Sequence, residues 1–366
     1  MRHQSIYVAA TGQHVGKTTS TLGLVQAFED LQGIGEIGYC KPVGQEISDL
    51  FTQQVDKDAF LFSKTMEFEL FPELHSPCIL GRGATTAFLD NPEGFQYHDR
   101  ILHAVETLNN IYDLVVYEGT GHPGVGSVVN LSNAKVAKMV GARVVLVVEG
   151  GIGSTIDSMC YALTPFEQQG VPIAGVIVNK VIPEKMEKVR KYLSIKLKQL
   201  GIPLLGIIPF DKNMGSPIML TIQLAVHGSF LCNPHLASNV VDRIIPGSLV
   251  DELERADESD HLLIVVSQKR IGTIISQIKR VIGKQPRLQI AGVVVTGEGL
   301  APVLLQPENM RFFKENKIPV VSTKLDTLGA FTKINRLEVK INTNTPWKIA
   351  RAIELIKENV NLDLLF

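Results

Sequence analysis

The sequence predicts an α/β fold in which a doubly wound, mostly parallel sheet with a phosphate-binding loop (P-loop) is followed by a second, smaller α/β domain. Short apolar runs alternate with amphipathic helical patterns, and this alternation is typical of parallel strands joined by helical crossovers. The chain has 366 residues, more than one hydrophobic core usually serves, so two domains are expected. With 45% hydrophobic and 20% charged residues, it can bury both cores.

The strands of the first domain are predicted from apolar runs that begin near the N-terminus. These runs cover residues 6–10, 37–43, 114–117, 144–148, 173–178 and 204–208. A polar, turn-rich stretch at residues 210–217 interrupts the pattern, and we place the domain boundary there. The first domain is therefore expected to span residues 1–215.

A second alternating pattern follows this boundary. Its expected strands are residues 261–266, 290–295 and 318–322. A helix is expected at residues 271–282, and the pattern contains no second Gly-Lys-Thr. We assign residues 216–335 to the second domain. Residues 336–366 form a C-terminal segment with a helix that begins after Thr345, with Pro346 in its first turn.

Composition disfavours several classes of partner. A formal net charge of -1 provides no basic surface for nucleic acid and no acidic tail. No apolar stretch approaches the ~20 residues needed to span a bilayer, so we expect no membrane partner and a cytoplasmic protein. The four cysteines are widely spaced and form no C-x-x-C pair, so buried thiols are expected.

The most informative motif lies at residues 10–19, which read ATGQHVGKTT between an expected strand and a helical run. Its glycines let backbone N–H groups turn toward one anion, and the helix that starts near Gly16 adds its positive dipole end. Lys17 supplies a mobile charge, and the Thr18 hydroxyl can hold Mg²⁺. The motif predicts an ATP or GTP site, with a chance Gly-Lys-Thr in a turn as the alternative.

The loop departs from the common form G-x-x-x-x-G-K-[ST]. The leading glycine of that form would fall at Thr11, and Gly12 follows one place later. Partition and division ATPases carry an extra lysine early in this loop. Because neither Thr11 nor Gly12 is lysine, that branch is disfavoured.

Charged side chains near other strand ends could complete a nucleotide site. Glu118 closes an apolar run and precedes a glycine-rich loop, where a metal-coordinating carboxylate belongs; an exposed edge acid is the alternative. Lys41 lies toward the carboxyl end of its expected strand, where its amine would be close to the loop. A solvated lysine is the alternative. Asp58 follows at a helix start, where it or Asp56 could instead be a helix cap.

Five motifs in order resemble dethiobiotin synthetase and the related cobyrinic acid a,c-diamide synthases. They are the loop at residues 10–18, Lys41-Pro42-Val43, Asp58-Ala59, Glu118-Gly119 and Val178-Asn179-Lys180. Thr11 and Gly12 stand where that family also departs from the common loop. The resemblance covers about residues 1–215.

The resemblance implies a Mg-ATP site and a role for each matching residue. Lys17 would bind the β- and γ-phosphates, and Lys41 would stabilise charge on a carboxylate or carbamate as it attacks the γ-phosphate; these two are the candidate catalytic residues. Asn179 would recognise adenine. The implied nucleotide-binding set is Thr11, Gly12, Val15, Gly16, Lys17, Thr18, Thr19 and Asn179. The implied Mg²⁺ ligands are Thr18, Asp58 and Glu118. Related synthetases build substrate sites at a dimer interface, so a homodimer is expected.

The second domain resembles a DRTGG domain, which follows a similar nucleotide-binding domain in the N-terminal part of long bacterial phosphotransacetylases. Residues 262–271, LLIVVSQKRI, are similar to the strand and turn that name that domain. The Gly-Asp-Arg expected at the turn reads Gln268-Lys269-Arg270 here, and only Arg270 matches.

Three functions fit the sequence. A nucleotide-dependent regulatory or sensing protein is preferred, because an intact loop precedes a second domain without recognisable catalytic residues. An ATP-dependent ligase that activates a carboxylate or carbamate is the alternative, supported by Lys41 and the metal acids. A degenerate remnant is disfavoured by Lys17, Thr18 and Glu118. The sequence leaves the second partner, a small molecule or a protein, unidentified.

Overall fold

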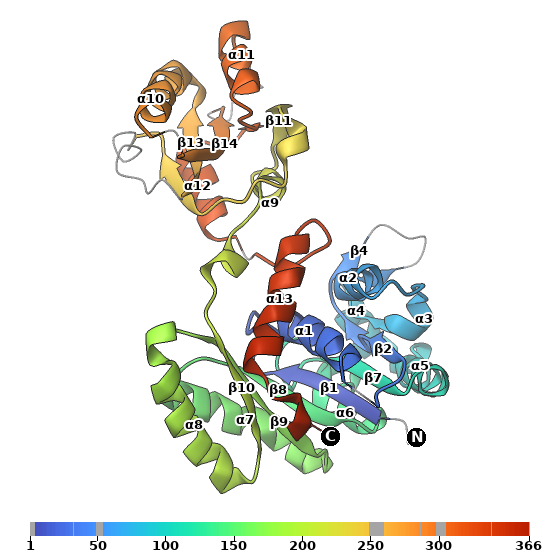
Figure 1. Ribbon diagram of the computed structural model, residues 1–366. Helices are drawn as coiled ribbons and strands as arrows, with labels where there is room; N and C mark the ends of the chain where they lie inside the picture. Colours follow the sequence, from blue (N-terminus) through green and yellow to red (C-terminus); the bar gives the residue numbers. More distant parts are fainter. Residues whose placement is uncertain are drawn as a thin grey trace. The chain divides into compact units, whose positions relative to one another are not determined.

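The computed structural model describes residues 4–31, 33–48, 54–248, 260–285, 287–297, 305–337 and 339–365. The chain divides into two compact units, one formed by Met1–Asp211 together with Ile341–Phe366 and the other by Lys212–Lys340 (Figure 1). Each unit has its own sheet, and the predicted α/β class with a mostly parallel sheet and a second, smaller unit is confirmed. No helix among the described residues is long and apolar enough to cross a membrane.

The first unit is built on a six-stranded sheet whose neighbouring strands are all parallel. In spatial order the strands are β10 (Leu204–Pro209), β9 (Ile173–Val181), β8 (Arg143–Glu149), β1 (Gln4–Ala10), β7 (Leu114–Glu118) and β2 (Ile37–Cys40). Both faces of the sheet are covered, so its strands are continuous apolar runs; Val144 to Val148 of β8, for example, are fully buried.

Helices cover the two faces of this sheet. One face packs against the helices α5 (Tyr97–Ile111), α6 (Asn133–Met139), α7 (Gly153–Gln169) and α8 (Met186–Leu200). On the other face lie α1 (Lys17–Glu29) and α13 (Pro346–Asn359) (Figure 1). Because the strands are parallel, their carboxyl ends, and the loops that follow them, lie at one edge of the sheet.

The segment after β2 differs from the prediction of one strand over residues 37–43. The strand ends at Cys40, and a short strand β3 (Val43–Gly44) begins after Pro42, because proline has no N–H to continue the hydrogen-bonded ladder. Short elements then follow Lys41 along the chain. They are β4 (Ile47–Ser48), β5 (Val55–Asp56), α2 (Lys57–Thr65), α3 (Pro72–His75), β6 (Cys78–Ile79) and α4 (Ala84–Asp90).

The C-terminal helix belongs to the first unit. The sequence predicts a separate C-terminal segment over residues 336–366, whereas the structure groups Ile341–Phe366 with the P-loop unit. Helix α13 packs beside α1 so closely that a Cβ on Gly23 would lie 2.2 Å from Ile356 Cγ1. The local sequence shows the apolar face of α13 but not the distant helix that covers it.

The second unit has a five-stranded sheet with strand order β11-β15-β14-β13-β12, parallel except for the β11–β15 pair. Its strands are β11 (Ser229–Cys232), β12 (Arg243–Pro246), β13 (His261–Ser267), β14 (Gln289–Thr296) and β15 (Val320–Thr323). Its helices are α9 (Met219–Ala225), α10 (Ile271–Lys284), α11 (Pro307–Glu315) and α12 (Thr327–Asn335). Helices α10 and α11 cover one face of the sheet, and α9 and α12 cover the other.

Candidate nucleotide site

The predicted phosphate-binding loop connects β1 to α1. The Thr11 N–H donates to Val147 O on the neighbouring β8 at 3.1 Å, which anchors the start of the loop. The loop ends at Gly16, whose φ of 99° is in the left-handed region that favours glycine. Helix α1 begins at the next residue, so Lys17 and Thr18 occupy its first turn. The local geometry is that of a helix N-terminus that presents backbone N–H groups to an anion.

Asn179, expected to recognise adenine, lies against the loop. Its Nδ2 donates to Val15 O at 2.9 Å, and its Oδ1 accepts from the Lys180 N–H at 2.9 Å. A Cβ on Gly16 would lie 2.0 Å from Asn179 Nδ2, so this approach also requires glycine. Asn179 therefore braces the loop in this structure, and its role in adenine recognition stays a prediction.

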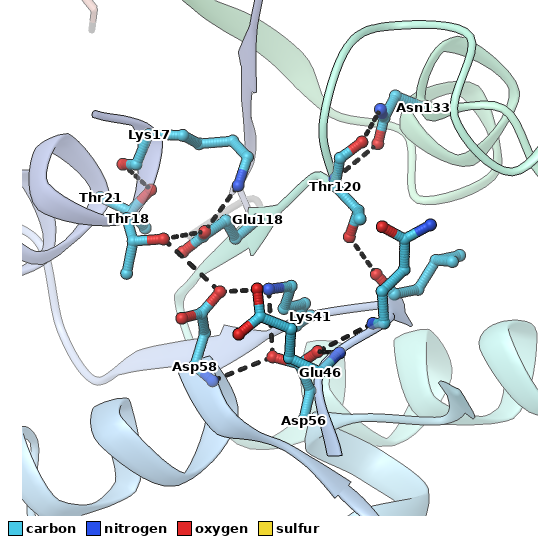
Figure 2. Close-up of polar contacts among 12 residues, drawn as sticks. Lys17, Thr18, Thr21, Lys41, Glu46, Asp56, Asp58, Glu118, Thr120 and Asn133 are labelled. Carbon is cyan, nitrogen blue, oxygen red and sulfur yellow. Dashed lines mark hydrogen bonds and ion pairs between the residues drawn. The ribbon is translucent and has the colours of Figure 1, made fainter. Parts of the chain in front are cut away.

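Lys17, Thr18 and Glu118 converge beside the loop (Figure 2). Lys17 Nζ lies 2.8 Å from Glu118 Oε1, and Thr18 Oγ1 donates to the same oxygen at 2.7 Å. Glu118 is the last residue of β7, which runs parallel to β1, and its side chain is fully buried. The expected metal acid is therefore not an exposed edge residue.

Lys41 and two aspartates form a second charged group next to the first (Figure 2). Lys41 Nζ lies 3.0 Å from Asp56 Oδ1 and also forms an ion pair with Asp58. Asp58 Oδ2 lies 3.5 Å from Thr18 Oγ1, whose proton goes to Glu118, so Thr18 lies between the two groups. Burial alone would lower the pKa of Lys41, but the carboxylates of Asp58 and Asp56 raise it above its ordinary value. Lys41 is therefore a buried, charged ammonium group and not a solvated lysine.

The two aspartates have different local roles, which the sequence left open. Asp56 is the N-cap of α2 and accepts the Asp58 N–H at 2.9 Å. Asp58 lies in the first turn of α2, where its side chain meets Thr18 and Lys41. The structure thus brings all three predicted Mg²⁺ ligands, Thr18, Asp58 and Glu118, together.

The remaining predicted loop residues lie around this centre. Thr11 and Gly12 are half-buried at the start of the loop, Val15 is buried under it, and Thr19 is half-buried in the first turns of α1. Gly12 has no positive φ, and a Cβ there would meet only Val15 Cγ2, at 3.7 Å. The nucleotide contacts of these four residues stay predictions.

Sequence reasoning missed Tyr39, which is hydrogen-bonded to Glu118. Its hydroxyl donates to Glu118 Oε2 at 3.2 Å, and its ring stacks on Phe62 of α2 with centroids 3.7 Å apart. Burial, and then the charge of Glu118, raise the pKa of Tyr39 well above its usual value, so the hydroxyl stays protonated. The available signal was its spacing of two residues from Lys41, at which side chains of an extended segment share a face.

Asn133 was also missed, and it holds the loop that follows Glu118. Its Oδ1 accepts from the Thr120 N–H at 2.9 Å and from Tyr7 OH at 2.7 Å. Its Nδ2 donates to Thr120 O and His122 O, each at 2.7 Å. Thr120 in turn donates its hydroxyl to Val43 O, close to Lys41 in sequence. No motif marks Asn133, because its partners are far away in sequence.

Comparison with protein families identifies the family of the first unit. A family model described as AAA_26, an AAA domain, matches residues 4–217, which include the loop, Lys41, Asp58, Glu118 and Asn179. The chain belongs to the AAA_26 family. The match ends close to the division between the two units.

Curated relatives of this chain include enzymes of two kinds. Phosphate acetyltransferase of Nitratidesulfovibrio vulgaris is 22% identical over 98% of this chain and 50% of its own length. A probable cobyric acid synthase of Methanocaldococcus jannaschii is 25% identical over 58% of this chain and 46% of its own length. The chain therefore spans about half the length of the curated relatives it matches.

Solved structures similar to this chain include the MinC:MinD cell division protein complex of Aquifex aeolicus, at 15% identity and a TM-score of 0.39 over 58% of this chain and 83% of that one. A ParA family ATPase of Chlorobium tepidum matches at 14% identity and a TM-score of 0.36, over 58% of this chain and 86% of that one.

We expect Tyr39→Phe to lower the stability of the ligand-free protein by about 1.5 to 3 kcal/mol, because it removes a hydrogen bond to a buried carboxylate. Tyr117→Phe is the matched control, since it removes a 3.3 Å hydrogen bond to the neutral Asn109 side chain. Urea unfolding followed by fluorescence measures both. A loss in Tyr39→Phe no larger than in Tyr117→Phe would contradict the support of Glu118 by Tyr39.

Proposed function

We propose that this chain binds Mg-ATP at the phosphate-binding loop of its first unit and acts as a nucleotide-dependent regulatory protein. The observation that carries the binding site is the convergence of Lys17, Thr18, Asp58 and Glu118 at one end of α1. A phosphate chain and its metal require a helix N-terminus, an ammonium group, a hydroxyl and carboxylates. Here α1, Lys17, Thr18, Asp58 and Glu118 supply them.

The donor set fits Mg²⁺ bound together with a nucleotide. Thr18, Asp58 and Glu118 offer hard oxygen ligands, with Thr18 Oγ1 2.7 Å from Glu118 Oε1 and 3.5 Å from Asp58 Oδ2. Among the described residues, no cluster of three or more His, Cys, Asp or Glu side chains could hold a metal. Mg²⁺ usually uses one or two carboxylates plus phosphate oxygens. The metal would therefore enter with the nucleotide and bind poorly alone.

Lys17 would change partners when the nucleotide binds. Its ammonium group is paired with Glu118 Oε1 at 2.8 Å, an oxygen also held by Thr18. With Mg-ATP bound, Lys17 would donate to the β- and γ-phosphates, and Glu118 would be available to the metal or its water. One carboxylate thus serves as a counter-ion before binding and as a metal ligand afterwards.

The regulatory role is supported by the second unit. It has its own sheet and its own hydrophobic cores on both sheet faces. A unit with its own core can respond to the nucleotide site as a separate domain. The match to phosphate acetyltransferase extends over 98% of this chain, so the similarity reaches beyond the P-loop unit. We propose that this unit is the DRTGG-like partner of the nucleotide site. The expected homodimer and cytoplasmic location also stay proposals.

A second candidate function is an ATP-dependent ligase, which Lys41 favours. Its buried ammonium lies beside Asp58, a proposed metal ligand, and could stabilise charge on a second substrate there. In such a reaction a carboxylate or carbamate oxygen forms a bond to the γ-phosphorus, and the bond to the bridging oxygen breaks to release ADP. The similarity to a probable cobyric acid synthase supports this candidate.

We expect Lys17→Ala to weaken Mg-ATP binding roughly ten- to a hundredfold, because a charge-assisted contact to phosphate is lost. Lys57→Ala is the control, since it removes the same charge from an exposed position next to Asp58. Isothermal titration calorimetry measures both affinities. Equal affinities in the two variants would contradict the site assignment.

If the protein senses ATP, Mg-ATP must favour one state of the second unit over another, because equal affinity shifts no equilibrium. Hydrogen exchange with and without Mg-ATP should then show changed protection within Lys212–Lys340. Helix α13 is an internal control, because it belongs to the first unit. Changes confined to the first unit, α13 included, would argue against the regulatory role.

The ligase candidate predicts phosphate release from ATP that depends on a co-substrate. We would test a panel of carboxylates, amines and bicarbonate, and expect Lys41→Met to reduce turnover by about a hundredfold or more while Lys57→Met leaves it intact. Mg-ATP binding without phosphate release for every member of the panel would leave the regulatory function as the better account.

A further inference from the structure

Asp56 is a buried carboxylate that the proposed nucleotide site does not yet use. Its Oδ2 accepts the backbone N–H groups of Gln45 at 3.0 Å and Glu46 at 3.1 Å. Its Oδ1 accepts the Asp58 N–H at 2.9 Å and lies 3.0 Å from Lys41 Nζ. Three backbone donors and one ammonium group hold this carboxylate in a single position.

The backbone is shaped to enclose Asp56. A Cβ on Gly44 would lie 2.6 Å from Asp56 Oδ2 and 2.7 Å from Asp56 Cβ, so only glycine lets the chain after Lys41 pass this closely. The two amides that follow Gly44 then point at the carboxylate. The segment that carries Lys41 and the segment that carries Asp58 are therefore tied together through Asp56.

Asp58 is held differently. Its side chain is 22% exposed, whereas that of Asp56 is fully buried. Its Oδ2 contacts both the ammonium group of Lys41 and the hydroxyl of Thr18, which is a proposed metal ligand. An oxygen that coordinates Mg²⁺, directly or through water, is less available to an ammonium group. Metal binding would therefore withdraw Asp58 from Lys41.

Lys41 cannot be left without a counter-ion, because its side chain is only 6% exposed and an unpaired buried charge is strongly destabilising. We propose that Asp56 is the fixed counter-ion of Lys41, which keeps the ammonium group in the site while Asp58 is released to the metal. Asp56 is thus a positioning residue, and the proposal rests on the Mg-ATP site proposed above. The two aspartates divide two tasks, a permanent one and an exchangeable one.

The test compares ATP affinity with and without Mg²⁺ in the full chain by calorimetry. Asp56→Asn keeps the shape of the side chain and, through its remaining oxygen, the helix cap on the Asp58 N–H, but it removes the charge and the two hydrogen bonds from Gln45 and Glu46. Asp58 is then the one aspartate left beside Lys41, so the gain in ATP affinity that Mg²⁺ provides should fall by roughly fivefold or more. Asp113→Asn is the control, because Asp113 accepts the Glu36 N–H at 3.2 Å at the opposite end of β7.

A double-mutant cycle separates this role from a purely structural one. In a Lys41→Met background Asp56 has no ammonium group to hold, so Asp56→Asn should change the Mg²⁺ gain little. An equal effect in both backgrounds, or an undiminished gain in Asp56→Asn alone, would overturn the proposal. If wild-type ATP binding gains nothing from Mg²⁺, the proposed function and this inference fail together. If the wild-type gain is present and the cycle is flat, only this inference fails.

The cycle also covers a folding defect. If Asp56→Asn does not fold, the Lys41→Met, Asp56→Asn double variant should fold, because removing both partners costs far less than removing one. A double variant that also fails to fold would show that Asp56 holds the backbone independently of Lys41, and would overturn the proposal.

Discussion

A buried charge is stable only beside its counter-charge, and this constraint organises the carboxyl edge of the first sheet. Glu118, fully buried at the end of β7, is held by the ammonium group of Lys17 and the hydroxyls of Thr18 and Tyr39. Lys41, nearly buried, is held between Asp56 and Asp58. Each of these two buried charges has more than one partner. Ion pairs therefore connect α1 to β7 through Lys17 and Glu118, and the segment of Lys41 to α2 through Asp58.

The parallel sheet makes this arrangement possible. Strand β1 lies between β7 and β8, and Val8 pairs with Glu118, so the acid stands directly beside the strand that leads into the loop. Strand β2 is the next neighbour of β7, which brings Lys41 to the same edge. In a parallel sheet the carboxyl ends of all strands face the same way, and ligands bind in the crevice beyond them.

The two lysines illustrate two uses of a buried ammonium group. Lys17 lies in the first turn of a helix and shares Glu118 Oε1 with Thr18, so a phosphate chain can replace its partner. Lys41 has two carboxylates, one of them fixed by three backbone N–H groups. Asn133 is also held in a fixed position, since it makes four hydrogen bonds that hold the loop after Glu118.

By itself, the sequence determined the α/β class, the loop, and the residues that meet beside it. Strand, loop and helix follow one another within about twenty residues, so short-range patterns carry this information. Only the tertiary structure decided that Asp56 is both a cap and a counter-ion, that Tyr39 and Asn133 support the site, and that α13 returns to the first unit. Apart from the Asp56 cap, these features depend on contacts between different elements, such as Gly23 of α1 with Ile356 of α13, which no local pattern encodes.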